Sequence, residues 1–271
     1  MTQPTDAEIA DAIAPLLADP GRTAIFSDLD GTLAPIVDNP RDSQVSDRTR
    51  QIFAALSTRY GAAGIVSGRP CLDARRVLDL DSLIYFGNHG FEALRPGVGS
   101  TPEIARVIGE HRDDVHAFTD PNLDEDLTGA VGLRIEDKRT IVALHWRGVE
   151  DEAAAEAEAE RLAAEAEKAG LWIHRGRKVL ELRPPVEVSK GTAMKSLLEG
   201  GRYGAAFYAG DDSTDVDAFK MLEEMRAGGA VTSCVRVAVL SDESPPELVA
   251  NADLAVEGIE GLEPVLEMIV A

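Results

Sequence analysis

The sequence predicts an α/β protein with a parallel β-sheet and a smaller α+β module inserted into it. Short apolar runs recur along the chain with helical stretches between them, a pattern typical of parallel strands joined by crossover helices. In the middle of the chain, the pattern changes to pairs of strands between helices. The 271 residues are 44% hydrophobic and 28% charged, which are ordinary values for a folded chain of one large domain or two smaller ones.

The main sheet is expected to contain six short apolar strands. These are residues 23–27, 62–67, 83–86, 205–209, 235–240 and 253–256. Between them, residues 47–60 and 214–225 repeat apolar side chains at helical spacing, and the first of these helices should begin at Ser46 or Asp47. We interpret both apolar stripes as helix faces that pack on the sheet.

The inserted module is expected to follow the order helix, strand, strand, helix, strand, strand. Its elements are predicted at residues 103–118, 131–136, 140–147, 151–169, 171–174 and 178–183. Alternation of apolar with polar or small residues in 131–136 is typical of a sheet with one covered and one free face. The stretch 151–169 is rich in Ala and Glu, so we predict a helix that Gly170 ends.

The acidic composition argues against several classes of partner. With 27 Lys and Arg against 48 Asp and Glu, the formal net charge is −21, which repels nucleic acids and anionic membranes. Cys71 and Cys234 are too few for a disulfide framework and lie in no zinc-binding pattern. The N-terminus lacks the features of a signal peptide, and no long uncharged apolar run occurs. We therefore expect a cytoplasmic monomer that acts on a small molecule.

Two acidic clusters directly follow predicted strands. Asp28 and Asp30 come after the first strand, where side chains project into the crevice in which α/β sheets bind ligands. Asp211, Asp212 and Asp215 follow strand 205–209 in the same way. Either cluster alone is also compatible with a calcium loop or a helix cap. Because carboxylates are costly to bury together without a cation, the two clusters predict a divalent ion with oxygen ligands, most plausibly Mg²⁺.

Two further segments offer groups that bind anions. Ser67-Gly68-Arg69 ends the second strand and presents a hydroxyl and backbone N–H groups. Lys190 begins a helix, so its ammonium lies near a helix N-terminus. Taken singly, Ser67 could be a turn residue and Lys190 a surface lysine. Together they predict an anion site that faces the metal site.

The order of these segments resembles that of the haloacid dehalogenase superfamily of phosphohydrolases. The segments are DxDGTL at residues 28–33, SGR at 67–69, a lysine before a helix at 190, and GDDxTD at 210–215. Further segments are similar to the trehalose-6-phosphate phosphatase family, namely GNHGFE at 87–92, EDK at 136–138, HWR at 145–147 and GRKVLELRP at 176–184. The resemblance implies a Rossmann-like core and an inserted αββαββ cap. The core would comprise residues 1–98 and 186–271, and the cap residues 99–185.

The resemblance also implies roles for the core residues. The residue at Asp28 attacks phosphorus and forms an aspartyl-phosphate, while the residue at Asp30 protonates the leaving oxygen and later takes a proton from water. We expect a raised pKa for Asp30 because it would lie among like charges. The remaining roles concern the metal and the phosphoryl group. Mg²⁺ would be bound by Asp28, the carbonyl of Asp30 and Asp211, with Asp212 or Asp215 behind them, and Ser67 and Lys190 would hold phosphoryl oxygens.

The insert is expected to select the substrate. The family's sugar-binding positions match Glu136, Lys138 and Glu181, and the resemblance places Gly68, Arg69 and His89 on the substrate side. Along strand 140–147, alternation puts His145 and Arg147 on one face and Val142, Leu144 and Trp146 on the other. In the last strand, Glu181 and Arg183 share a face, and Trp146 and Trp172 are expected to pack inside the insert.

The implied activity is Mg²⁺-dependent hydrolysis of trehalose 6-phosphate, the last step of trehalose biosynthesis. Two alternatives stay open: the same chemistry on another glycosyl phosphate, such as sucrose phosphate or mannosylglycerate phosphate, and a sensor without catalysis. A sensor should have lost one of Asp28, Asp30, Lys190 or Asp211, and all four are present. The chain departs from the family at Asn88, Val216 and the strand end at 145–147, where many relatives carry Ser, Glu and Tyr; these positions bear on sugar preference.

Overall fold

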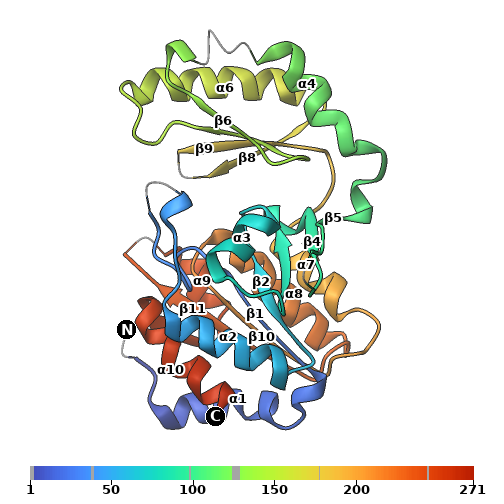
Figure 1. Cartoon of the computed structure of the whole chain (residues 1–271), viewed down its shortest axis with the longest axis vertical. Helices are drawn as coiled ribbons and strands as arrows, with labels where there is room; N and C mark the ends of the chain where they lie inside the picture. Colours follow the sequence, from blue (N-terminus) through green and yellow to red (C-terminus); the bar gives the residue numbers. More distant parts are fainter. Residues whose placement is uncertain (1–2, 38–39, 98, 124–128, 177, 243) are drawn as a thin grey trace. The chain divides into compact units, whose positions relative to one another are not determined.

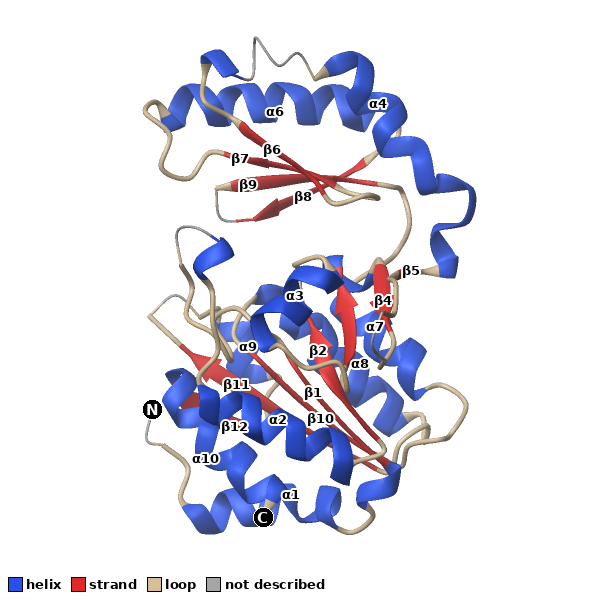
Figure 2. Cartoon of the chain, in the orientation of Figure 1, coloured by secondary structure: helices blue, strands red, loops and turns tan. Residues whose placement is uncertain are grey.

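A computed structural model describes residues 3–37, 40–97, 99–123, 129–176, 178–242 and 244–271. The chain forms two compact units, one of Met1–Ile104 with Val188–Ala271 and one of Ala105–Glu187. The larger unit is an α/β layer structure and the smaller unit is α+β, so the predicted fold class is confirmed (Figures 1 and 2). Within the described residues, every helix is too short or too polar to cross a lipid bilayer.

The larger unit contains an eight-stranded sheet in the order β12-β11-β10-β1-β2-β3-β4-β5. Its parallel strands are β1 (Thr23–Ser27), β2 (Ala62–Val66), β3 (Ile84–Gly87), β10 (Ala205–Gly210), β11 (Ser233–Leu240) and β12 (Leu254–Glu257). Two antiparallel strands, β4 (Glu92–Leu94) and β5 (Glu103–Ile104), extend one edge. The six predicted core strands are confirmed within two residues at each end, whereas the antiparallel extension is an addition.

Helices cover both faces of this sheet. One face packs against α1 (Asp6–Leu17), α2 (Asp47–Arg59), α3 (Cys71–Leu78) and α10 (Gly258–Val270). The other face packs against α7 (Lys190–Leu198), α8 (Ser213–Ala227) and α9 (Pro246–Ala250). Strand β1 serves both layers, because Ile25 points into the first core while Ala24 and Phe26 point into the second. Both apolar stripes predicted from the sequence are core faces.

Polar side chains fix the starts of the helices that reach the carboxyl edge of the sheet. The Ser46 hydroxyl accepts a hydrogen bond from the backbone N–H of Thr49 (2.9 Å), which confirms the predicted start of α2. Ser189 and Thr192 form a reciprocal capping box at the start of α7, so Lys190 is the first residue of that helix. Lys190 is therefore a buried residue at the N-terminus of α7.

The smaller unit is a four-stranded antiparallel sheet with helix α6 (Glu152–Lys168) on one face. The strands are β6 (Arg134–Asp137), β7 (Val142–His145), β9 (Val179–Arg183) and β8 (Trp172–Gly176) in spatial order. Val142, Leu144 and Trp146 pack with α6 in one buried cluster, as the alternation predicted. Gly170, with φ +93°, follows the end of α6 and also agrees with the sequence prediction.

Two expectations for the inserted module are wrong. The predicted helix over 103–118 is instead β5, a 3₁₀ segment η4 (Arg106–Asp113) and a shorter helix α4 (Asp114–Asn122). Gly109 interrupts the helical backbone at φ +49° and ψ −120°, which divides the segment. Trp172 does not pack inside: it is 48% exposed. Ile173 takes the inward position on strand β8, so its neighbour Trp172 points to the opposite face, paired in register with Arg183.

Gly64 in β2 offers a test of how tightly the large sheet is packed. A Cβ atom at this position would lie 2.0 Å from the Ile84 carbonyl oxygen and 2.6 Å from the Phe26 ring. We expect Gly64→Ala to lower the free energy of unfolding by about 1–3 kcal/mol, because neither the strand nor the ring can move freely. Gly204→Ala is the matched control, since its Cβ would meet only the Thr232 hydroxyl at 3.9 Å. Urea denaturation followed by circular dichroism measures both, and equal stability of the two variants would contradict the prediction.

Candidate active site

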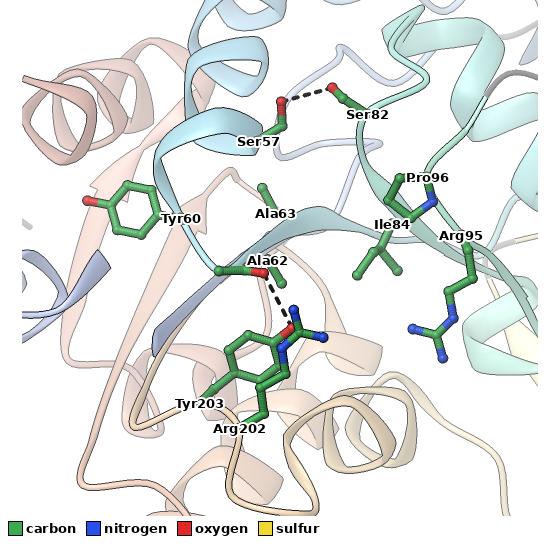
Figure 3. Close-up of a pocket in the computed structure, with 11 residues that line it drawn as sticks. Ser57, Tyr60, Ala62, Ala63, Ser82, Ile84, Arg95, Pro96, Arg202 and Tyr203 are labelled. Carbon is green, nitrogen blue, oxygen red and sulfur yellow. Dashed lines mark hydrogen bonds between the residues drawn. The ribbon is translucent and has the colours of Figure 1, made fainter. Parts of the chain in front are cut away.

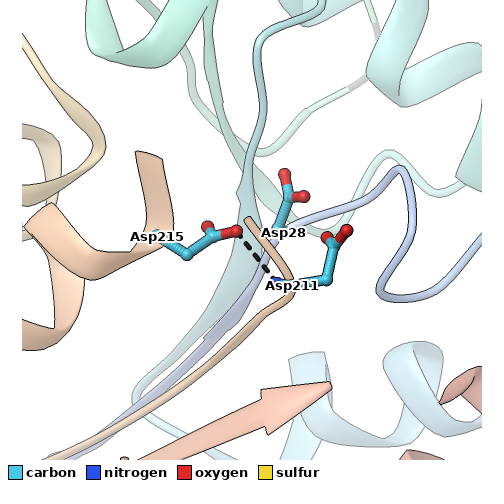
Figure 4. Close-up of side chains that lie close together, drawn as sticks. All are labelled: Asp28, Asp211 and Asp215. Atoms are coloured by element: carbon cyan, nitrogen blue, oxygen red, sulfur yellow. Dashed lines mark hydrogen bonds between the residues drawn. The ribbon is translucent and has the colours of Figure 1, made fainter. Parts of the chain in front are cut away.

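Parallel pairing of β1 with β10 brings the two acidic clusters together. Ser27 is in register with Ala209, and the backbone N–H of Asp28 donates to the carbonyl of Ala209 (2.8 Å). Carboxylate oxygens of Asp28, Asp211 and Asp215 all lie within 4.8 Å of one another. Figure 4 shows these three side chains converging at the carboxyl edge of the sheet. The predicted meeting of Asp28 with Asp211 is therefore present in the structure.

Lys190 supplies the positive charge of this cluster. Its Nζ lies 2.9 Å from Asp28 Oδ1 and 2.8 Å from Asp215 Oδ1, and the residue is only 2% exposed. Burial alone would lower the pKa of Lys190, but the carboxylates of Asp215 and Asp28 hold it well above its ordinary value. The alternative that Lys190 is a surface lysine is excluded. Its ammonium stays protonated and braces one oxygen of Asp28.

Asp215 is held by four donors. Its Oδ1 accepts from Lys190 Nζ and the Tyr208 hydroxyl, each at 2.8 Å. Its Oδ2 accepts from the backbone N–H groups of Asp211 (3.0 Å) and Asp212 (3.1 Å). Because these donors occupy both oxygens, Asp215 fixes the loop that carries Asp211 and has little capacity left to bind a cation.

Asp211 lies against the turn that follows β1. Its Oδ1 accepts from the Thr32 hydroxyl (2.8 Å). Gly31 has φ +88°, and a Cβ atom there would lie 2.1 Å from Asp211 Oδ2, so only glycine permits both the turn and this approach. Burial raises the pKa of Asp211 to about 7, and the negative charge of Asp215 adds to the effect.

The donor set at this edge fits a hard divalent cation. Burial also raises the pKa of Asp28, and the Lys190 ammonium opposes this effect. Asp28 and Asp211 are thus two adjacent, buried carboxylates whose ionised forms need more positive charge than one lysine supplies. Carboxylate and carbonyl oxygens are the ligands that Mg²⁺ prefers. Asp28 and Asp211, rather than Asp215, are the side chains available to hold it.

Asp30 lies in different surroundings from those expected. Its carboxylate accepts from Arg69 through both oxygens, with Nε to Oδ2 at 2.5 Å and Nη2 to Oδ1 at 2.6 Å, and from the Ser43 hydroxyl at 3.3 Å. The expectation that Asp30 lies among like charges is therefore wrong. Strand β1 ends at Ser27, so the strand alternation that would align Asp30 with Asp28 does not continue. The charged neighbour of Asp30 is therefore the Arg69 guanidinium.

The loop after β3 is built against the end of β2. The backbone N–H groups of Asn88 and His89 donate to the carbonyls of Arg69 and Ser67, each at 2.8 Å. Asn88 and His89 both have positive φ, at 50° and 59°, an uncommon backbone conformation for residues with side chains. A Cβ at Gly68 would lie 2.9 Å from the His89 ring. Glycine at 68 therefore lets the imidazole lie against Ser67-Gly68-Arg69.

In the smaller unit, the three residues matched to sugar binding form one network. Lys138 Nζ lies 2.9 Å from Glu181 Oε1 and 3.9 Å from Glu136 Oε2. His145 Nε2 lies 2.9 Å from Glu136 Oε2, and this hydrogen bond is the main cause of a lowered pKa for Glu136. Arg183 pairs with Glu181 Oε2. Leu180 and Leu182, on either side of Glu181, point into the cluster that packs with α6. Because side chains alternate along a strand, Glu181 and the network lie on the sheet face opposite α6.

Sequence reasoning missed two hydroxyl groups at the site. Thr32 and Tyr208 donate to Asp211 and Asp215. A signal for each was present: Thr32 lies within the acidic turn, and Tyr208 places a hydroxyl in an otherwise apolar strand. Their partners could not be found without the fold, because Thr32 lies 179 positions from Asp211.

The fold of the chain is one that solved hydrolases share. The chain shares its fold with a haloacid dehalogenase-like hydrolase from Bacteroides thetaiotaomicron, at a TM-score of 0.64 and 15% identity, over 91% of this chain and 99% of that one. The chain belongs to the trehalose-phosphatase family, whose sequence pattern matches residues 26–253.

Individual relatives agree with this assignment. A probable trehalose-phosphate phosphatase 2 of Oryza sativa is 33% identical, over 81% of this chain and 63% of that protein. The trehalose 6-phosphate phosphatase RA3 of Zea mays is 30% identical, over 85% of this chain and 65% of that protein. The chain thus spans just under two thirds of the length of these relatives. A crystal structure of a trehalose-6-phosphate phosphatase related protein superposes with a TM-score of 0.70 at 26% identity, over 91% of this chain and 96% of that one.

The anchoring of Asp215 gives a stability prediction. Asp215→Ala leaves the buried Lys190 ammonium without one of its two close carboxylates, and should lower the free energy of unfolding by about 3–5 kcal/mol. Tyr208→Phe removes one donor from the same carboxylate and should cost about 1 kcal/mol. Urea denaturation in the presence of a chelator measures both without any contribution from a metal. A smaller loss for Asp215→Ala than for Tyr208→Phe would contradict the anchoring role.

Proposed function

We propose that the protein hydrolyses trehalose 6-phosphate to trehalose and phosphate, the last step of trehalose biosynthesis. One observation carries the proposal: in a chain of the trehalose-phosphatase family, Asp28 lies between the Lys190 ammonium and the Asp211 carboxylate. A carboxylate placed next to a cation site and braced by a buried lysine is suited to attack a phosphate ester. The family membership directs this chemistry to a sugar phosphate.

The reaction is proposed to proceed in two displacements. Lys190 engages Oδ1 of Asp28, and Oδ2 attacks phosphorus as the bond from phosphorus to the sugar oxygen breaks. Asp30 gives its proton to that leaving oxygen. In the second step, Asp30 takes a proton from water while the water oxygen attacks phosphorus, which releases phosphate and restores Asp28. The two steps together consume one water molecule and restore Asp28 and Asp30 to their starting forms.

Mg²⁺ is the proposed cofactor, held by the carboxylates of Asp28 and Asp211 and the backbone carbonyl of Asp30. When bound, it neutralises charge on the phosphoryl oxygens. Asp212 and Asp215 are proposed to support these ligands without binding the ion. Asp215 does so by accepting hydrogen bonds from the backbone N–H groups of Asp211 and Asp212. Ser67 and Lys190 are proposed to hold phosphoryl oxygens, as donors suited to an anion.

Arg69 has a specific part in this scheme. In this arrangement, Arg69 occupies both carboxylate oxygens of Asp30, so neither oxygen is open to the leaving oxygen of a substrate. We therefore propose that Arg69 releases Asp30 and turns to the substrate phosphate when the substrate binds. Gly68 and His89 are proposed to contact the substrate beside it.

The smaller unit is proposed to act as the cap that selects the sugar. Glu136 and Glu181 would accept hydrogen bonds from sugar hydroxyls, and Lys138 would donate them. The ion pairs among these residues support the proposal, because they hold each side chain in place before the sugar binds.

We also propose that the protein works as a cytoplasmic monomer on small sugar phosphates and not on nucleic acids. The net charge of −21 opposes binding to a polyanion. Cys71 and Cys234 are both free thiols, which agrees with a reducing compartment.

Asp28→Asn tests the nucleophile. The amide has nearly the shape of the carboxylate but cannot form the aspartyl-phosphate, so phosphate release from trehalose 6-phosphate with Mg²⁺ should be abolished. The control is Asp73→Asn, a change on helix α3 that should leave turnover intact. Thermal unfolding verifies that both variants are folded. Substantial residual turnover by a folded Asp28→Asn protein would reject covalent catalysis by this residue.

Glu181→Gln tests sugar recognition. Loss of a charged hydrogen bond worth about 1.5–3 kcal/mol should lower kcat/KM for trehalose 6-phosphate by about 10- to 150-fold. A small aryl phosphate makes no such contact, so its kcat/KM should change little. Sucrose 6-phosphate and mannosylglycerate phosphate are measured alongside to test the assigned sugar. Equal losses on the sugar phosphate and the aryl phosphate would show that Glu181 serves the fold.

A further inference from the structure

A cavity of about 390 Å³ lies in the larger unit, at the edge of the sheet opposite the acidic site. Its walls include Ala62 and Ile84, at the beginnings of β2 and β3, and Tyr203, just before β10 (Figure 3). Because these strands are parallel, the cavity is at their amino ends, whereas Asp28 and Asp211 follow the carboxyl ends of β1 and β10. The volume falls within the range of roughly 300–1,000 Å³ that is typical of small-molecule sites.

Two arginines give this cavity a positive charge. Figure 3 shows the guanidinium groups of Arg95 and Arg202 turned toward the same space. Neither arginine forms an ion pair within the part of the chain that the structure describes, and no acidic residue is among those that line the cavity there. Arg202 lies over the Tyr203 ring, 5.3 Å from its centroid. In a chain with 48 acidic and 27 basic residues, two arginines that face one cavity without a carboxylate form a local anion-attracting site.

Apolar side chains and an aromatic ring complete the walls of the cavity. The hydroxyl groups along the cavity already donate within the protein. Ser82 donates to Ser57 and Ser57 to the Ala54 carbonyl, each at 2.8 Å, and Tyr203 donates to the Gly61 carbonyl at 3.4 Å. Gly61 brings the Tyr203 ring close to the start of β2, since a Cβ there would lie 3.1 Å from the ring and 2.3 Å from the Gly21 carbonyl oxygen. The cavity therefore offers two charged donor groups, Arg95 and Arg202, together with an aromatic wall.

We propose that this cavity binds a small phosphate monoester. Arg95 and Arg202 would hold the phosphate group, because the planar guanidinium matches two phosphate oxygens at once. The body of the molecule would lie against Tyr203 and Ile84. A monoester suits the space better than inorganic phosphate, since the cavity has room for more than the phosphate group. The site is separate from the proposed catalytic residues and does not depend on the proposed function.

The test uses the full chain labelled with ¹⁵N, titrated with glucose 6-phosphate or inorganic phosphate in the presence of a chelator. Backbone signals of Gly61 and Ser82 report on the cavity, and those of Gly31 and Asp211 report on the acidic site. Glucose 6-phosphate should shift the Gly61 and Ser82 signals in a saturable way. It should bind there more tightly than inorganic phosphate.

Paired variants decide the role of the arginines. Arg95→Gln combined with Arg202→Gln should raise the Kd measured at Gly61 and Ser82 by about 10-fold or more, the effect of losing charged hydrogen bonds. Signals of Gly31 and Asp211 should respond as in the parent protein. The control combines Arg106→Gln with Arg112→Gln, which removes the same charge from exposed positions of the smaller unit.

Three outcomes would overturn the proposal. The first is the absence of saturable shifts at Gly61 and Ser82 with millimolar glucose 6-phosphate. The second is an equal rise in Kd for the control pair, which would reveal a general charge effect. The third is tighter binding of inorganic phosphate, which would reject a monoester. Because every readout is binding at the cavity, failure here leaves the proposed hydrolysis untouched, and loss of hydrolysis leaves this site untouched.

Discussion

The charge balance around the Lys190 ammonium is the constraint on which the acidic end of the sheet depends. An ammonium buried this deeply costs several kcal/mol in lost hydration unless carboxylates compensate for it. Lys190 begins α7, Asp28 follows β1, and Asp215 lies in the first turn of α8, so one set of ion pairs ties together three segments far apart in the sequence. The same contacts orient Asp28 and, through the backbone N–H groups that Asp215 binds, position the loop that carries Asp211.

Two aspartates separated by a single residue have been given opposite environments. Asp28 is buried against a lysine and between other carboxylates, whereas Asp30 is partly exposed and faces an arginine. A nucleophile needs to be fixed in one orientation, while a proton carrier must change its partner and its charge during the reaction. The two environments therefore agree with the different roles proposed for Asp28 and Asp30.

Much of this arrangement could be predicted from the sequence, because it depends on local patterns and on the topology of parallel sheets. Strand 23–27 has the predicted bounds, and its pairing with β10 brings Asp28 to Asp211. The partners of Asp30 and Asp215 could not be predicted, because Arg69 and Tyr208 reach them only through tertiary packing. The prediction for Trp172 is wrong because the alternation of strand β8 gives the inward position to Ile173 and the exposed position to Trp172.

The distribution of aromatic residues has a practical consequence for spectroscopy. Both tryptophans, Trp146 and Trp172, belong to the smaller unit, and the four tyrosines all lie in the larger one. Indole emission excited near the red edge of absorption therefore reports on the smaller unit alone. Trp146 is buried and Trp172 half-exposed, so an aqueous collisional quencher such as iodide separates their signals without labelling. Melting of the smaller unit can therefore be followed by indole emission in an unmodified sample.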